Sequence, residues 1–189
     1  MPEVNALLEK IADAKTEGGW VVIGSAVGQQ LGRDFAGALD RCRTFVIAAG
    51  VWYATDILGE RVPGPALVTD LRQALTLLAP WREDANRWMR RTVGVAAHFW
   101  AKRARGAPKL LPQAKILLDF IAPMFEEREM DAIKGVGWGL KTLGKYYPEL
   151  VADWLAQQVA QRHPRALMLR KALTYLPARQ RARILKGVS

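Results

Sequence analysis

The sequence predicts an all-α protein, and three features of the chain carry that prediction. Apolar residues recur at helical spacing along most of the chain, period-two alternation of Val, Ile and Thr is nearly absent, and Gly and Pro interrupt the pattern at short intervals. Many helices joined by short turns favour stacked helix pairs over a four-helix bundle. We therefore expect a right-handed α-solenoid of HEAT-like helix pairs with a concave basic face, although sequence similarity between the pairs is weak.

The expected helices follow the apolar periodicity and the turn residues in chain order. Pro148 suits the first turn of a helix, where no amide donor is lost, and "RGAPKLLP" at 105–112 is the clearest loop. The expected helices are 3–15, 20–31, 34–49, 51–61, 65–79, 84–104, 110–122, 129–146, 149–162, 165–175 and 179–186.

Length and composition predict one folded domain over residues 1–189, half of whose residues are hydrophobic. Cys42 is the only cysteine, which excludes an internal disulfide and a cysteine-rich zinc site. With only two histidines besides, we expect no metal and no cofactor. The longest apolar run, "FVIAAGVWYA", is about half the length of a membrane span. We therefore expect a cytoplasmic protein with no membrane contact, and nothing in the sequence requires more than a monomer.

Positive charge is concentrated in the second part of the chain. The net charge of +10 divides into −2 over residues 1–80 and +12 over residues 81–189. A polyanion partner requires concentrated positive charge, because neutralising phosphates releases condensed counterions. The charge distribution therefore favours a nucleic acid as the partner over a merely basic surface.

The stretch "VWYATDILGE" places a carboxylate beside an indole on a helix that otherwise has core character. Trp52 and Asp56 are spaced i, i+4 and share a helix face. Indole faces attract cations, and a carboxylate can stabilise an oxocarbenium-like centre or activate water in sugar-bond cleavage. The pair therefore suits removal of a positively charged base from DNA. Taken alone, however, the pair favours a structural interpretation, in which Trp52 is a wedge residue and Asp56 is bonded to a neighbouring helix end.

Two further stretches carry cations beside indoles. Arg87, Arg90 and Arg91 surround Trp88 at the start of one predicted helix. In "DAIKGVGWGLKTLGKYYPEL", a single stripe carries Lys134, Trp138, Lys141 and Lys145. We predict that these six cations hold a DNA backbone, although close helix packing around the four glycines of the second stretch is the alternative.

Taken in order, these three stretches resemble the AlkD-like DNA alkylation-repair glycosylases, a family of HEAT-like repeat proteins. The matching elements are Trp52-x-x-x-Asp56, Trp88-x-x-Arg91, and Lys134-x-x-Gly137-Trp138 with a following Pro148. The resemblance covers residues 40–178, whereas residues 1–39 match poorly.

That resemblance implies a metal-free, monofunctional hydrolase that excises 3-methyladenine and 7-methylguanine from duplex DNA in base excision repair. It implies that Asp56 is the catalytic carboxylate, that Trp52 and Trp138 are indole walls, and that Arg91 contacts a phosphate. The alternative is a non-catalytic HEAT-like module that binds nucleic acid or a protein partner. A purely structural protein-interaction solenoid would leave the basic part of the chain unexplained.

Overall fold

The protein is all-helical, as the sequence predicts. The computed structural model describes residues 2–187, which form twelve α-helices and four short 3₁₀ helices and contain no strand. The ends of the predicted 1–189 domain, residues 1, 188 and 189, lie outside the described part. The α-helices are α1 (Pro2–Asp13), α2 (Glu17–Gln29), α3 (Phe35–Ala49), α4 (Trp52–Arg61), α5 (Pro63–Thr69), α6 (Leu71–Leu78), α7 (Arg87–Ala104), α8 (Leu111–Ile121), α9 (Met130–Tyr146), α10 (Pro148–Gln161), α11 (Ala166–Ala172) and α12 (Ala178–Leu185).

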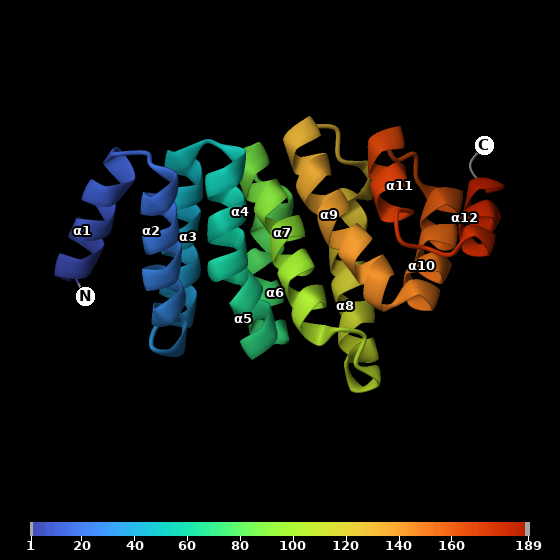
Figure 1. The fold of residues 1–189 in the computed structure, drawn as a ribbon, viewed down its shortest axis with the longest axis horizontal. Helices are drawn as coiled ribbons and strands as arrows, with labels where there is room; N and C mark the ends of the chain where they lie inside the picture. The colour runs from blue at the N-terminus through green and yellow to red at the C-terminus, as the bar shows by residue number, and fades with distance from the viewer. Residues whose placement is uncertain (1, 188–189) are drawn as a thin grey trace.

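The helices follow one another along the long axis of the molecule, from α1 at one end to α12 at the other (Figure 1). In one row, each helix packs against the next in the order α2, α4, α7, α9, α11. Helices between them in sequence, including α3, α8 and α10, pack against this row as a second layer (Figure 1). Buried apolar side chains fill the space between the layers, among them Trp20, Leu58, Met89, Phe125 and Leu140.

One predicted helix, 65–79, is wrong because two helices occupy this region. The chain leaves the helical conformation at Asp70, whose φ is −145° and whose carboxylate accepts a hydrogen bond from the amide of Gln73 at 3.0 Å. Asp70 thus ends α5 and provides the N-cap of α6, a role that favours Asp. A similar cap corrects the predicted start at residue 84, because Asn86 accepts from the amide of Trp88 at 2.8 Å and α7 begins at Arg87.

The closest helix approach joins α7 to α9 and explains two of the glycines that crowd α9. A side chain at Gly139 would meet the carbonyl oxygen of Gly94 at 2.7 Å, and one at Gly135 would meet that of Arg91 at 2.6 Å. Helix packing, one of the two explanations that the sequence leaves open, therefore accounts for these positions. The crossing also brings the side chains of α7 against those of α9, where the predicted site residues lie.

Candidate active site

Three residues of α4 form a single stripe, and two of them contact side chains of α7. Trp52, Asp56 and Glu60 follow one another at one-turn intervals. Trp52 is 56% exposed and its ring meets that of Tyr53 edge-on, with 5.8 Å between the centroids. The helix starts at Trp52, directly after α3 has ended at Gly50 in a left-handed conformation, with φ of 60°. This tight connection places an exposed indole one turn before Asp56.

Asp56 has a partner inside the protein, the guanidinium of Arg91. Arg91 Nε donates to Asp56 Oδ1 at 2.8 Å, and Arg91 Nη2 donates to Asp56 Oδ2 at 2.7 Å. A third bond, 3.0 Å long, runs from Arg91 Nη1 to the backbone carbonyl of Asp131 on α9. Arg91 is only 6% exposed. This bidentate pair fixes the plane of the carboxylate and ties α4 to α7 and α9, while each carboxylate oxygen keeps lone-pair capacity for a further contact.

A second contact between α4 and α7 lies one turn further along. His98, on the same face of α7 as Arg91, has its Nε2 3.3 Å from Oε1 of Glu60. That contact is within ion-pair distance but lacks hydrogen-bond geometry. The nearby imidazole of His98 lowers the pKa of Glu60 below its ordinary range, although burial acts in the opposite direction. The sequence analysis did not select these two residues, although their helical spacing from Asp56 and Arg91 was available.

Trp138 of α9 stacks on His98, with 3.8 Å between ring centroids and 24° between the ring planes. His98 Nδ1 lies 2.7 Å from Thr142 Oγ1, and this hydroxyl is also 3.0 Å from the carbonyl of Trp138. Trp138 is two turns after Asp131, whose carbonyl binds Arg91. Asp56 and Trp138 therefore belong to the same side of the α4–α7–α9 row, with Trp138 partly exposed.

The other two predicted arginines of α7 also have carboxylate partners. Arg90 pairs with Glu127, with 2.7 Å between Nε and Oε2, and donates to the backbone carbonyl of Asp84 at 2.6 Å. Arg87 is 49% exposed and lies 3.2 Å from Asp131 Oδ2, with its guanidinium over the ring of Trp88. The arginines thus connect α7 to its neighbours, and Arg87 is the most accessible of the three.

The lysines of α9 are arranged differently. Lys134 and Lys145 are exposed and Lys141 is partly exposed. Among the described residues, none of the three has a carboxylate within 4.0 Å. Lys141 Nζ lies 5.0 Å from the ring centroid of Tyr175, and Lys145 Nζ lies 5.6 Å from it. The three lysines are therefore unpaired with acids, and two of them, Lys141 and Lys145, lie near an aromatic ring that follows α11.

Lys171 of α11 adds a further cation that the sequence analysis missed. Its aliphatic stem lies against Gly137, where a side chain would meet its Cδ at 2.6 Å. Burial lowers the pKa of Lys171, and the positive charges of Lys141, Arg91 and Lys134 act in the same direction. Only the approach of α11 to α9 brings Lys171 and Tyr175 to this position, so no spacing within the sequence could have identified them. The cluster of Lys134, Lys141, Lys145, Lys171 and Tyr175 is called the lysine cluster below.

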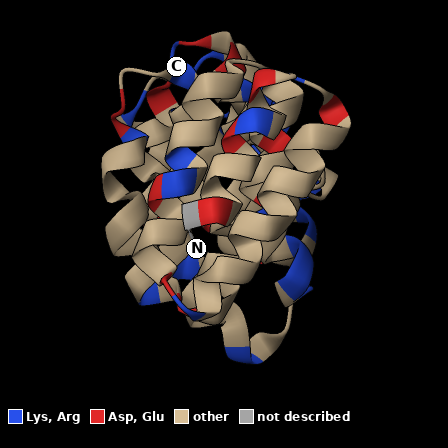
Figure 2. Cartoon of the chain, turned by 90° about the vertical axis from the view of Figure 1, so that its left-hand side faces the viewer, with Lys and Arg blue, Asp and Glu red and all other residues tan. Residues whose placement is uncertain are grey.

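Charges of both signs are mixed at the N-terminal end of the molecule. Figure 2, which looks onto this end, shows acidic and basic positions next to one another on the helices.

In the part of the chain that the structure describes, no group of three His, Cys, Asp or Glu side chains is placed to hold a metal ion. Across the same residues, every helix is too short or too polar to cross a lipid bilayer.

This geometry defines an all-helical protein with a paired carboxylate, two accessible indoles and an unpaired lysine cluster along one row of helices. A family model described as DNA alkylation repair enzyme matches residues 5–176. The chain therefore belongs to the family of DNA alkylation repair enzymes, which indicates an enzyme with a role in DNA repair and DNA as its substrate. The match includes most of residues 1–39, which the three motifs do not reach. Neither the curated proteins nor the solved structures contain a match to the chain.

Proposed function

We propose that this protein is a monofunctional DNA glycosylase that hydrolyses the N-glycosidic bond of cationic alkylated purines, such as 3-methyladenine and 7-methylguanine, in duplex DNA. Membership of the DNA alkylation repair family supports the substrate class. The observation that carries the proposal is the oriented Asp56 carboxylate, which Arg91 holds one turn from the exposed Trp52. A carboxylate and indole rings at one place suit a reaction in which positive charge moves from a base to a sugar.

The proposed reaction needs a negative group and a water molecule, and no acid catalyst. The bond between the purine nitrogen and C1′ breaks, and its electron pair neutralises the cationic base, which leaves without being protonated. The sugar becomes an oxocarbenium-like cation that the Asp56 carboxylate stabilises electrostatically. Water then adds to C1′ and gives one proton to Asp56 or to solvent, which leaves an abasic site.

In this mechanism Arg91 has a positioning role in addition to the phosphate contact that the sequence resemblance implies. Its two hydrogen bonds aim Asp56, and its third bond anchors the pair to α9. The residual N–H groups of Arg91 remain available for a phosphate oxygen. A fixed carboxylate is already oriented when charge develops on the sugar, so little reorganisation is needed during the reaction.

The lysine cluster is the proposed site for the DNA backbone, together with Arg87 and, at the edge, Arg90. Ammonium groups without carboxylate partners provide affinity for phosphates but no sequence information. The packing of α2, α4, α7, α9 and α11 in succession is compatible with a HEAT-like solenoid, and we propose that it is right-handed and that this row forms its concave basic face. A DNA duplex on that face would lie across Trp52, Asp56 and Trp138 at once. We expect a monomer to suffice, because all of these residues come from one chain.

The test is release of methylated bases from alkylated duplex DNA, with wild type and Asp56→Asn compared at equal DNA occupancy. Asn keeps the shape of the side chain but removes the charge, so we expect a loss of about a hundredfold or more. Asp119→Asn, on the exposed surface of α8, is the matched control and should release base like the wild type. DNA binding without base release by the wild type would instead support the non-catalytic DNA-binding module.

A further inference from the structure

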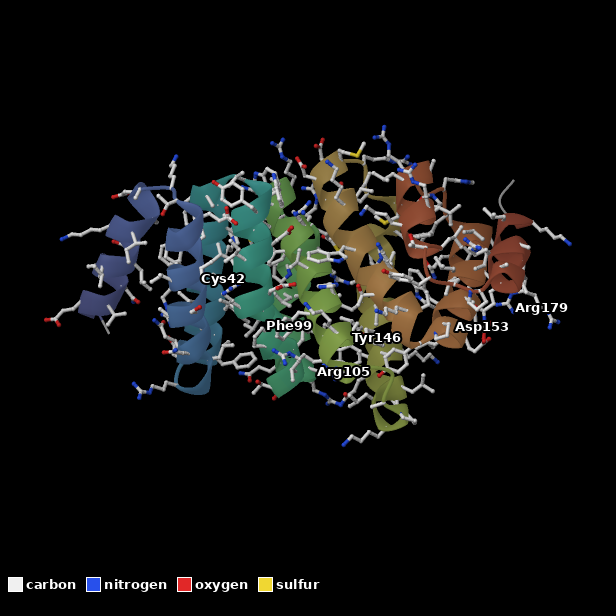
Figure 3. All side chains as sticks on the ribbon, in the orientation of Figure 1. Cys42, Phe99, Arg105, Tyr146, Asp153 and Arg179 are labelled. Atoms are coloured by element: carbon white, nitrogen blue, oxygen red, sulfur yellow. The ribbon has the colours of Figure 1, made fainter. Side chains whose placement is uncertain are left out.

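His98 lies directly beneath one of the two indoles of the proposed site. The imidazole is 6% exposed and stacks on Trp138 at 3.8 Å. His98 belongs to α7, and Figure 3 labels the next residue of this helix, Phe99, in the central part of the molecule. Any group that binds against the ring face of Trp138 opposite His98 is therefore separated from the imidazole by the thickness of one aromatic ring.

The polar neighbours of His98 allow two protonation states. If the Thr142 hydroxyl donates to the carbonyl of Trp138, it must accept from His98 Nδ1–H. Nε2 faces the carboxylate of Glu60 at 3.3 Å, where a proton is favourable and a lone pair is repelled. Both nitrogens are then protonated and the ring is an imidazolium. If the hydroxyl turns to donate to Nδ1 instead, the ring is neutral and Nε2 alone carries a proton. Rotation of one hydroxyl accompanies the change between the two states.

Charged groups lie on α7 itself and on two of the helices packed against it, α4 and α9. On α4, Glu60 faces Nε2, and Arg61 acts on Glu60 through its charge. On α7 itself, Lys102 lies 3.8 Å from Glu60, and Arg91 is already paired with Asp56. On α9, Lys141 and Lys145 lie against Tyr175. Glu60 is thus the one carboxylate in contact with the imidazole among the described residues.

We propose that His98 is a positioning residue that sets the charge beneath Trp138 and thereby the affinity of this indole for a cationic base. A neutral imidazole leaves the indole able to attract a cation, whereas an imidazolium on one face weakens attraction for a second cation on the other. This proposal rests on the proposed function, because the cation concerned is the alkylated purine. It adds a control of substrate affinity by pH that does not involve Asp56.

The first measurement follows the charge of His98 directly by NMR titration of the histidine ring signals. The chain contains only two histidines, and His163→Gln removes the signal of the other one. We expect the ring signals of His98 to report both protonation states that rotation of the Thr142 hydroxyl allows, because histidine is the side chain that most readily changes charge near neutral pH. Glu60→Gln removes the carboxylate that favours the imidazolium, so it should increase the share of the neutral ring at a given pH. His98 ring signals that show a single protonation state at every pH would overturn the proposal.

The second measurement is the pH dependence of base release at protein well below saturation, where the rate depends on affinity for the methylated DNA, corrected for spontaneous loss of the base. In wild type we expect the rate to fall about threefold to tenfold from about pH 8 to about pH 5, in line with loss of a cation–π contact. His98→Phe keeps an aromatic ring beneath Trp138 without a titrating group, and the part of this fall due to His98 should disappear. His163→Gln, which changes an exposed residue, should retain the whole fall.

Identical pH profiles of wild type and a folded His98→Phe would contradict the proposal. If His98→Phe does not fold, Glu60→Gln decides the question, because it should shift the profile of base release together with the NMR transition. Absence of base release by the wild type at every pH would contradict the proposed function but would leave this inference testable. In that case, competition between methylated and unmethylated duplex should show a preference for the methylated one that falls as His98 becomes charged, and no such change would overturn it.

Discussion

The arginines of α7 and the lysines of α9 and α11 lie side by side but have different surroundings. Arg87, Arg90 and Arg91 each lie within 3.2 Å of a carboxylate oxygen. The members of the lysine cluster have no such partner among the described residues, and burial with neighbouring cations lowers the pKa of Lys171. Ion-paired arginines stabilise the contact between helices, whereas unpaired cations attract an external anion. Two sets of positive charge that look alike in the sequence therefore differ in the protein: each arginine already joins helices, whatever phosphate it also contacts, whereas the lysines have only an external anion to bind.

The largest effect that we expect is on the free energy of unfolding, when Arg91, one of the paired arginines, is replaced. Arg91→Met leaves the partly buried Asp56 without its partner and removes the bond to α9, so the free energy of unfolding should fall by about 3 kcal/mol at neutral pH. Urea denaturation followed by circular dichroism would measure it.

The double variant Asp56→Leu with Arg91→Met distinguishes the effect of an unpaired Asp56 charge from the effect of losing the other contacts of Arg91. It removes both charges, and should therefore recover much of the lost stability. A single Arg91→Met variant as stable as the wild type would show that this pair does not hold α4 against α7.

The second effect concerns DNA affinity, at the lysine cluster. Replacing Lys134, Lys141 and Lys171 together by Gln should leave the free energy of unfolding nearly unchanged but weaken DNA binding about a hundredfold at ~0.1 M salt. The slope of log affinity against log salt concentration should decrease by about three, because each phosphate contact contributes about one. Fluorescence anisotropy with a labelled duplex at several salt concentrations measures both quantities.

A control of equal charge change tests whether position or total charge matters. Three exposed lysines outside the α9–α11 surface serve this purpose: Lys10, Lys109 and Lys115. Their replacement by Gln should change the salt slope by less than one. Equal losses in both triple variants would show that net charge alone attracts DNA and would remove the basis for the lysine cluster as a binding site.

The sequence was sufficient to predict the helical fold and most helix bounds, because helical spacing and capping residues are local signals. It failed at Asp70, where a capping side chain divides an amphipathic stretch whose periodicity alone favours one helix. Local spacing also placed Trp52 and Asp56 on one face. The ion-pair partners could not be predicted, because Asp56 and Arg91 come from helices separated by two others along the chain.

The same limit explains why the sequence grouped six cations that the structure separates. Arg90 and Lys134 are both basic residues on helices that carry tryptophan, yet only Arg90 meets a carboxylate from a distant segment, Glu127. Lys171 was overlooked for the converse reason, because its place beside Gly137 depends on the packing of α11 against α9. Family membership supports the DNA-repair role but does not assign these residues.

Arg87 sharpens the comparison because it has features of both groups. It has a carboxylate neighbour, Asp131, but is 49% exposed, and exposed ion pairs contribute little. Arg87→Gln should therefore change the free energy of unfolding by at most about 0.5 kcal/mol. If Arg87 contacts a phosphate, the salt slope of DNA binding should decrease by about one.

Arg43→Gln on α3 is the matched control for Arg87, because Arg43 is also exposed and paired with an aspartate, Asp84, at 2.9 Å. It should reproduce the small change in stability but leave the salt slope unaltered. An unchanged slope in Arg87→Gln as well would mean that Arg87 contacts no phosphate and serves only its ion pair with Asp131.

The smallest expected effect is the pH dependence that Lys171 gives to stability. Burial, with the charges of Lys141 and Arg91, holds the pKa of Lys171 below its ordinary value, so the unfolded chain binds this proton more tightly than the folded protein does. The charged lysine therefore opposes folding at neutral pH, and this cost disappears as the pH rises towards about 10.4, the ordinary lysine value. Lys171→Met keeps the stem against Gly137 and removes the charge, so it should raise the free energy of unfolding at pH 7 by at most about 0.5 kcal/mol. The difference should shrink in urea titrations at higher pH and should reverse when a short DNA duplex is added, because a phosphate stabilises only the wild-type ammonium. A variant that is less stable than wild type at every pH would mean that Lys171 contributes to folding and is not held in place for an anion.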